Sequence, residues 1–251
     1  MYEQSAIDVL FLEGRLEEAA AKYYEAARNG SPRCAFNYGY CLLRGRGVKT
    51  DYKRAAEYFA YAKNQKGGEA EYNLALMAMH GYGMSRDFKR AIAYMRESAE
   101  LGCVEAQLYL GMAYTLGAVF EPEISAICLI PYHKAEYIPD DEFLLGGAVD
   151  MEAEEEARMS VISSDDREAF EWFRMAAHGD PTYAEDLVAR GQFMYAKCYL
   201  DGFGTGYDRT KGARLMLLAG KNGSREAVEY LEANGHITQL LLEEKKEKNP
   251  R

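Results

Sequence analysis

The sequence contains no apolar run near the roughly 18 residues that a membrane-spanning helix needs, so no membrane span is expected. Its first 18 residues carry Glu3, Asp8 and Glu13 and lack the basic start, apolar core and cleavage site of a secretory signal. Its five cysteines are odd in number and irregularly spaced, unlike a disulfide framework. These absences predict a cytoplasmic protein with reduced thiols and no membrane contact.

Signatures of metal sites and of catalysis are also missing. The four histidines are not paired at metal-ligand spacing, and no Ser/His/Asp or Cys/His grouping follows from spacing. Glycine pairs occur after helical stretches and lack a third glycine at the spacing of a phosphate-binding loop. With 40 acidic and 30 basic residues the net charge is −10, which disfavours nucleic-acid binding. We therefore expect no metal, no cofactor and no nucleic-acid partner.

What the sequence does contain is a repeat of about 36 residues. A full copy has two amphipathic stretches with helical spacing, separated by Gly-x-Gly and a following aspartate, whereas residues 14–33 form a half-copy without Gly-x-Gly. The glycines supply positive φ at the end of the first helix, and the aspartate caps the second. Small residues on the first helix (Gly39, Ala75, Gly111, Ala196) are expected to face Ala55, Ala91, Ala169 and Gly212 on the second. The copies cover residues 14–33, 34–69, 70–105, 106–117 with 165–183, and 191–226, followed by a C-terminal cap at 227–251.

The motif A-x-x-N-L/Y-G/A, followed by G-x-G-V/M, D-x-x-x-A and a final A-x-x-x-G, resembles the Sel-1-like repeat, a relative of the tetratricopeptide repeat. The resemblance covers residues 14–117 and 165–232. It implies an all-α fold, a right-handed α-solenoid of four or five stacked helix pairs forming a single domain over residues 1–251. It also implies a scaffold for protein partners that is rarely catalytic. Two departures are a missing second glycine after Gly117 and an apparent seven-residue insertion at 184–190.

Residues 118–164 interrupt the third copy and hold most of the formal charge. They contain 11 acidic and two basic residues, a net charge of −9. Apolar clusters at 126–132 and 143–149 distinguish this insertion from a plain acidic linker. Glu152 and Glu156 are spaced to share a cation, but a solvated helix face is the preferred interpretation. The candidate acidic contacts are Asp140, Asp141, Glu142, Glu152, Glu154, Glu155 and Glu156.

In related repeats the first helices line the concave face, so side chains there that packing does not require are candidate partner contacts. Two asparagines at equivalent positions could hold a peptide backbone through their amide groups, although local bonding is the simpler interpretation. The candidate set is Asn37, Tyr40, Arg44, Asn73, His80 and Tyr109. The leading hypothesis is a non-catalytic scaffold that binds a protein or peptide with a basic face. The alternative is an enzyme or small-molecule binder, with a hydrolase-like site between the insertion and the groove.

Overall fold

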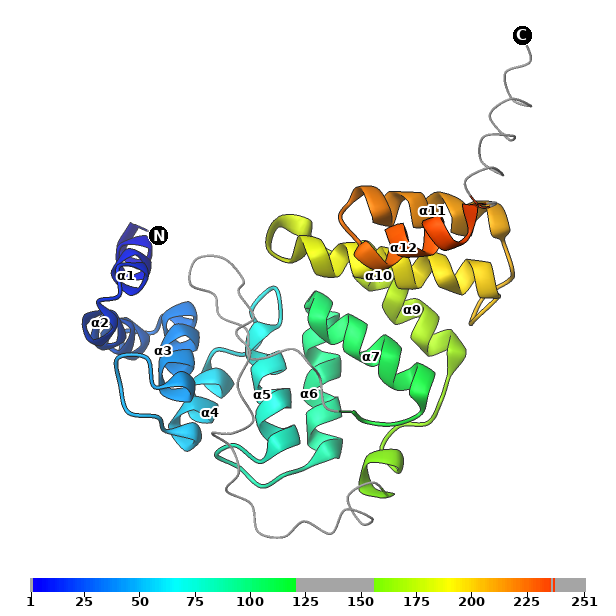
Figure 1. The fold of residues 1–251 in the computed structure, drawn as a ribbon. Helices are drawn as coiled ribbons and strands as arrows, with labels where there is room; N and C mark the ends of the chain where they lie inside the picture. The colour runs from blue at the N-terminus through cyan, green and yellow to red at the C-terminus, as the bar shows by residue number, and fades with distance from the viewer. Residues whose placement is uncertain (1, 121–155, 236, 238–251) are drawn as a thin grey trace. The chain divides into compact units, whose positions relative to one another are not determined.

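The computed structural model describes residues 2–120, 156–235 and 237. Every regular element in these residues is a helix, which confirms the predicted all-α fold (Figure 1). Within them, none of the helices combines the length and the hydropathy needed to traverse a lipid bilayer.

The helices pack as two compact units. The described residues up to 103, together with 119–120 and 156–161, form unit 1, and those of 104–118 and from 162 onward form unit 2. Unit 1 contains α1 (Tyr2–Leu12), α2 (Leu16–Arg28), α3 (Pro32–Arg44), α4 (Tyr52–Tyr61), α5 (Glu69–His80) and α6 (Phe88–Glu100). Unit 2 contains α7 (Val104–Leu116), α9 (Asp166–Ala177), α10 (Pro181–Asp201), α11 (Arg209–Lys221) and α12 (Arg225–Ala233).

Consecutive helices pair as the repeat predicts. In unit 1, α3 packs on α4 and α5 packs on α6, and in unit 2, α7 packs on α9 and α10 on α11 (Figure 1). The helix α1 packs on α2, so the first pair begins upstream of residue 14. Each pair buries the small residues and aromatic rings of its facing sides, because a lone amphipathic helix cannot bury its apolar face.

An aspartate caps the second helix of four repeats, as expected from the sequence. Asp51 Oδ1 accepts a hydrogen bond from the backbone N–H of Arg54 at 3.0 Å. The same contact recurs at Asp87, Asp165 and Asp208. Because the first N–H groups of a helix have no partner within it, each cap fixes the start of its helix and contributes about 1 kcal/mol.

A recurring backbone hydrogen bond closes the loop between the two helices of a repeat. The N–H of the capping aspartate donates to a carbonyl near the end of the first helix. In the third repeat Asp165 bonds to Tyr114 at 3.0 Å, although 51 residues separate them in the sequence. The helices of this repeat therefore meet at the same junction as those of the others. The other three examples, each spanning nine residues, are Asp51 to Leu42, Asp87 to Ala78 and Asp208 to Tyr199, at 2.9 to 3.0 Å.

The two glycines of a Gly-x-Gly element have different structural roles. The first, such as Gly81 with φ 78°, ends the helix in the left-handed region, and a Cβ there would meet its nearest neighbour at 3.4 Å. The second, Gly83 with φ 68°, lies so close to the start of α4 that a Cβ would overlap the Tyr52 carbonyl. Gly47 approaches the start of α2 in the same way. The second glycine thus joins one repeat to the second helix of the repeat before it.

The predicted close approach of the paired helices is present. A Cβ built on Gly39 would lie 3.2 Å from the Phe59 ring and 3.3 Å from the Ala55 carbonyl, and one on Gly111 would lie 2.5 Å from the Phe173 ring. At the equivalent positions of the four repeats, glycine on the first helix occurs with phenylalanine on the second, and alanine occurs with methionine. The four combinations are Gly39 with Phe59, Ala75 with Met95, Gly111 with Phe173 and Ala196 with Met216, and the alanines and methionines are fully buried.

The apparent insertion at 184–190 lengthens a helix instead of forming a loop. Backbone angles are non-helical at Ala184, and α10 then continues to Asp201. Val188 and Ala189 are buried, which shows that the added turns join the core of unit 2.

Candidate functional site

The candidate residues of the first helices lie in the most buried helices of unit 1. All ten residues of 34–43 in α3 are buried, as are all ten of 70–79 in α5. Asn37 and Asn73 are completely buried, and Tyr40 is 1 % exposed. Arg44 and His80, at the C-terminal ends of α3 and α5, are half-buried. Tyr109, which is also buried, lies on α7 in unit 2, so five of the six candidate residues belong to one unit.

Asn37 takes part in a buried polar cluster centred on Asp8 of α1. Its Nδ2 donates to Asp8 Oδ1 at 3.5 Å, and the Tyr23 hydroxyl donates to the same oxygen at 2.5 Å. The guanidinium of Arg33 lies 3.9 Å from the other Asp8 oxygen. Asp8 is 7 % exposed, so these neighbours offset the cost of burying its charge. The amide oxygen of Asn37 is buried without a hydrogen-bond partner.

Sequence reasoning did not find the role of Asp8. Its partners lie 15 and 29 residues further along the chain, so local sequence does not reveal them. One signal was available, since Asp8 interrupts the otherwise apolar stretch Ile7–Leu12. A charge within an apolar helix face usually has a buried partner.

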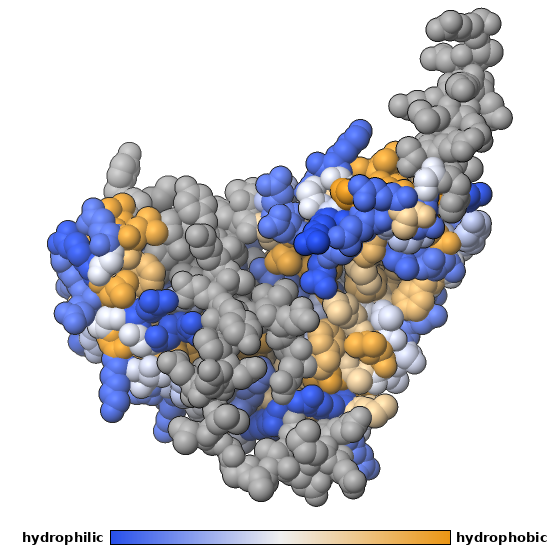
Figure 2. Space-filling model, viewed as in Figure 1, coloured by the Kyte–Doolittle hydropathy of each residue, from blue (hydrophilic) through white to orange (hydrophobic). Residues whose placement is uncertain are grey.

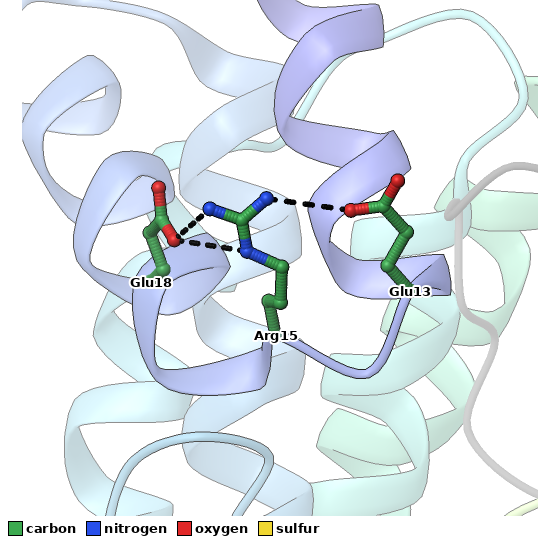
Figure 3. Close-up of polar contacts among 3 residues, drawn as sticks. All are labelled: Glu13, Arg15 and Glu18. Atoms are coloured by element: carbon green, nitrogen blue, oxygen red, sulfur yellow. Dashed lines mark hydrogen bonds and ion pairs between the residues drawn. The ribbon is translucent and has the colours of Figure 1, made fainter.

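An ion-pair cluster holds the turn between α1 and α2. Arg15 lies between two glutamates, one from the end of α1 and one from the first turn of α2 (Figure 3). Its Nη2 contacts Glu18 at 2.5 Å and its Nη1 contacts Glu13 at 3.4 Å. The hydrogen bond to Glu18, with the charges of both glutamates, raises the pKa of Arg15. These side chains are exposed, so the cluster orients the turn more than it stabilises the fold.

A pocket of about 520 Å³ opens beside this turn, among α1, α2 and the start of α3. Its volume falls within the usual range of ligand pockets, about 300–1,000 Å³. Hydrophobic surface is exposed over the N-terminal helices (Figure 2), where Val9 and Leu12 are 48 % and 61 % exposed. Val9 and Leu12 do not line the pocket, whose own apolar side chains include Ala6, Ile7 and Leu10, beside charged groups of both signs. Lining residues include Ala6, Ile7 and Leu10 of α1, Glu18, Lys22 and Glu25 of α2, and Cys34.

Unit 2 contains an aromatic cluster with one cation. Lys211 Nζ donates to the Tyr199 hydroxyl at 2.6 Å and lies 4.1 Å from the centre of the same ring. The Tyr195 hydroxyl is 3.3 Å from that of Tyr199. Burial raises the pKa of Tyr199, but the hydrogen bond from Lys211 and the neighbouring charge outweigh it, so the pKa is lowered. Burial raises the pKa of Tyr195. Lys211 therefore favours Tyr199 as the member of the pair whose hydroxyl oxygen accepts a hydrogen bond.

The acidic candidates lie mostly outside the described residues. Of the seven, only Glu156 is described, and it is exposed in a helical turn at 156–159. Asp140, Asp141, Glu142, Glu152, Glu154 and Glu155 fall outside this part of the chain. In the described part, no group of three or more His, Cys, Asp or Glu side chains is arranged to hold a metal ion.

Comparisons with known proteins agree with this architecture. Five stretches match the Sel1 repeat family: residues 32–66, 68–103, 104–122, 158–180 and 189–224. No curated protein matches the chain significantly. A solved Sel1 repeat protein from Oxalobacter formigenes is similar, with a TM-score of 0.61 and 23 % identity over 87 % of this chain and 49 % of that one.

A second similar structure is c5321, a protective antigen of uropathogenic Escherichia coli strains that displays an SLR fold. Its TM-score is 0.61, with 20 % identity over 92 % of this chain and 42 % of that one. The chain therefore spans less than half the length of either solved protein. At these identities the two structures establish the fold, and the repeat matches establish the family. With helix pairs, aspartate caps and glycine turns in the matched positions, the chain belongs to the Sel1 repeat family.

Proposed function

We propose that this chain is a non-catalytic scaffold that binds a peptide or protein along the first helices of its repeats. The observation that carries the proposal is the match of five repeat stretches to a family whose members generally serve as protein-interaction scaffolds. Stacked helix pairs of this kind present an extended surface of equivalent positions, which suits an extended partner. Family members are generally non-catalytic, in keeping with this role.

The candidate contacts are the side chains that differ between repeats at positions where the packing residues recur. The position of Arg44 in α3 is taken by His80 in α5, whereas Ala55 and Ala91 recur as packing residues in the paired helices. Arg44 and His80 are half-buried at the ends of their helices, so a partner can reach them without opening the core. We place the partner contacts there and not at Asn37 and Asn73, because the amide groups of both asparagines are completely buried.

The acidic insertion is proposed to modulate binding through its charge. Its net charge of −9 accounts for nearly all of the net charge of the chain. A partner with a basic face would be attracted to it at long range, and the association rate would fall as salt screens the charges. This part of the proposal concerns specificity and rate, because electrostatic steering adds less to equilibrium affinity.

The test is affinity capture from the native host with three versions of the chain, followed by mass spectrometry. The wild type should retain a specific protein that an Arg44→Ala/His80→Ala variant loses. Glu57→Ala, an exposed change on the second helix α4, serves as the control and should retain it. Circular dichroism must show the same helical content for all three. Equal capture by the wild type and the double variant would place the binding surface elsewhere.

A further inference from the structure

Two arginines on the second helices of unit 1, Arg54 and Arg90, contact tyrosines. The Nε and Nη2 of Arg90 in α6 donate to the Tyr94 hydroxyl at 3.3 and 3.0 Å. Arg54, at the equivalent position in α4, has its guanidinium 5.9 Å from the centre of the Tyr38 ring. The Tyr38 ring in turn packs edge-on against Tyr58, at 4.8 Å. Both guanidinium groups are thus held in place by neutral partners.

Some other arginines form ion pairs instead. Arg174 pairs with Glu171 at 2.7 Å and Arg225 with Glu229 at 2.8 Å, so neighbouring carboxylates neutralise them. In the described part of the chain, neither Arg54 nor Arg90 forms an ion pair. A phenol orients a guanidinium through its ring and hydroxyl but leaves the positive charge uncompensated. Both arginines are exposed, so this charge faces solvent.

The two sites lie at the same edge of unit 1. Gly83, in the loop that leads into α6, packs directly on the backbone of Tyr52 and Lys53 at the start of α4. A lysine precedes the arginine in both helices, and Lys53 and Lys89 are also exposed. Residues 46–58 and 84–94 each carry a net charge of +2, in a chain whose net charge is −10. We call Lys53, Arg54, Lys89 and Arg90 the Lys-Arg surface.

The nearby acidic side chains cancel only part of this charge, because each segment keeps a net charge of +2 with its acidic residues counted. Asp51 and Asp87 accept hydrogen bonds from the backbone N–H groups of Arg54 and Arg90, so they are engaged as helix caps. One N–H group at each helix start is therefore already bonded to its capping aspartate, and we assign recognition at this surface to the four cationic side chains. Sequence spacing contained a signal for the arrangement, because Tyr58 and Tyr94 follow the arginines by one helical turn.

We propose that the Lys-Arg surface binds an acidic peptide segment of a protein partner, independently of the first-helix contacts proposed above. Carboxylates match the planar fork of arginine, and a guanidinium already oriented by tyrosine loses less freedom on binding. A short peptide fits better than a nucleic acid, since the strongly negative chain repels a long polyanion while four clustered cations attract a local group of carboxylates.

The probe is a fluorescein-labelled decaglutamate peptide, followed by fluorescence anisotropy at 50 and 200 mM salt. The wild type should bind at low salt, and binding should weaken as salt rises. Arg54→Gln/Arg90→Gln should weaken binding at least tenfold. Lys22→Gln/Lys221→Gln removes the same net charge from exposed positions on α2 and α11 and should change affinity less than twofold. Tyr94→Phe keeps the ring but removes the hydroxyl that orients Arg90, and should weaken binding two- to threefold.

Each result decides the proposal. Equal losses in the two double variants would show that only net charge matters and would overturn it. Absence of binding by the wild type at 50 mM salt would also overturn it. If a labelled oligothymidylate binds the wild type more tightly than decaglutamate and is lost in Arg54→Gln/Arg90→Gln, the surface serves nucleic acid instead. Matching melting temperatures across the variants exclude unfolding as the cause.

Discussion

At the scale of single residues, the size of the side chain on one helix of a pair is matched to the size of the residue at the facing position of the other helix. Gly111 admits the ring of Phe173, whereas Ala75 is found with the slimmer Met95 at the equivalent positions. The chain thus contains two solutions to the same packing problem, one built on glycine and one on alanine. Closely packed interiors make such substitutions interdependent, because an added methyl group has nowhere to go unless its neighbour changes.

The first prediction is that Gly111→Ala destabilises the protein and that adding Phe173→Met restores much of the loss. Alanine gains about 1 kcal/mol in a helix over glycine. Here the new Cβ would lie 2.5 Å from the Phe173 ring, so we expect overpacking of about 1–3 kcal/mol to exceed that gain. The free energies of unfolding in urea for both single variants and the double variant give the coupling.

Gly39→Ala is the matched control for this cycle. Its Cβ would lie 3.2 Å from the Phe59 ring, so a small shift of the ring accommodates it and the net change should be within about 0.5 kcal/mol. If Gly111→Ala is as mild as Gly39→Ala, the fit between the two helices is looser than the structure indicates. If Phe173→Met fails to compensate, the two side chains are not coupled.

The second prediction concerns thiol reactivity. Cys198 is 3 % exposed, and burial, with the charge of Asp201 nearby, raises the pKa of its thiol to about 12. At pH 8 roughly one molecule in 10⁴ then carries the reactive thiolate. Iodoacetamide at pH 8 should therefore leave Cys198 unmodified in the native protein and alkylate it completely in urea, as read by peptide mass mapping. Equal rates in the two conditions would contradict the burial of this thiol.

All five thiols should titrate in urea without reductant. The four that lie in the described residues, Cys34, Cys41, Cys103 and Cys198, form no disulfide and are buried. The fifth, Cys128, lies outside them. A disulfide found by mass mapping would contradict the reducing compartment predicted from the sequence.

At the scale of helices and loops, the third prediction separates two glycines of one turn. Gly81→Ala should cost about 1–2 kcal/mol, the strain of a left-handed residue with a side chain. Gly83→Ala should cost clearly more, because its Cβ also overlaps the Tyr52 backbone at the start of α4. Urea unfolding of the two variants makes the comparison. Equal losses would mean that backbone strain alone explains both glycines and that the contact between repeats is unimportant.

The helices and their ends could be predicted from the sequence because their determinants are local. Gly45 and Asp51 lie within ten residues of the helix ends that they define, and the repeat shows them several times. The cluster around Asp8 could not be predicted, since its partners are Tyr23 and Asn37 on other helices. For the same reason the sequence placed Asn37 on the correct helix but could not show that its side chain is completely buried.

At the scale of the whole molecule, the fourth prediction is that the insertion can be replaced without loss of the fold. Residues 117–164 would be exchanged for GYGMSR, the sequence of residues 81–86, which lies between the matching helices of the preceding repeat. The hydrogen bond from Asp165 to Tyr114 should remain, and its loop shortens from 51 residues to nine. Loop closure then costs about 1.5 kcal/mol less, so helical content and cooperative unfolding should persist.

The midpoint of unfolding of this variant and its affinity for the partner show what the insertion contributes. A fall in the midpoint of unfolding would indicate that the apolar clusters at 126–132 and 143–149 pack on the helices, since their removal uncovers an apolar patch. Failure to fold would make the insertion part of the core. The exchange removes a net charge of −9 and adds one arginine, so the net charge rises from −10 to 0. The partner captured by the wild type should bind more weakly, and unchanged affinity would assign recognition to the first helices alone.

The junction between Tyr114 and Asp165 has a consequence for how this protein could be divided. None of the contacts at this junction needs a peptide linkage between its two sides. These contacts are the hydrogen bond, the packing of α7 on α9 and the contact of the Phe173 ring with Gly111. If the chain were divided once within residues 121–155, one polypeptide would carry α7 and the other would carry α9, the two helices of one pair. Produced together, they should recognise one another through α7 and α9 and reassemble as a split protein, with fusion tags at the new termini reporting their union.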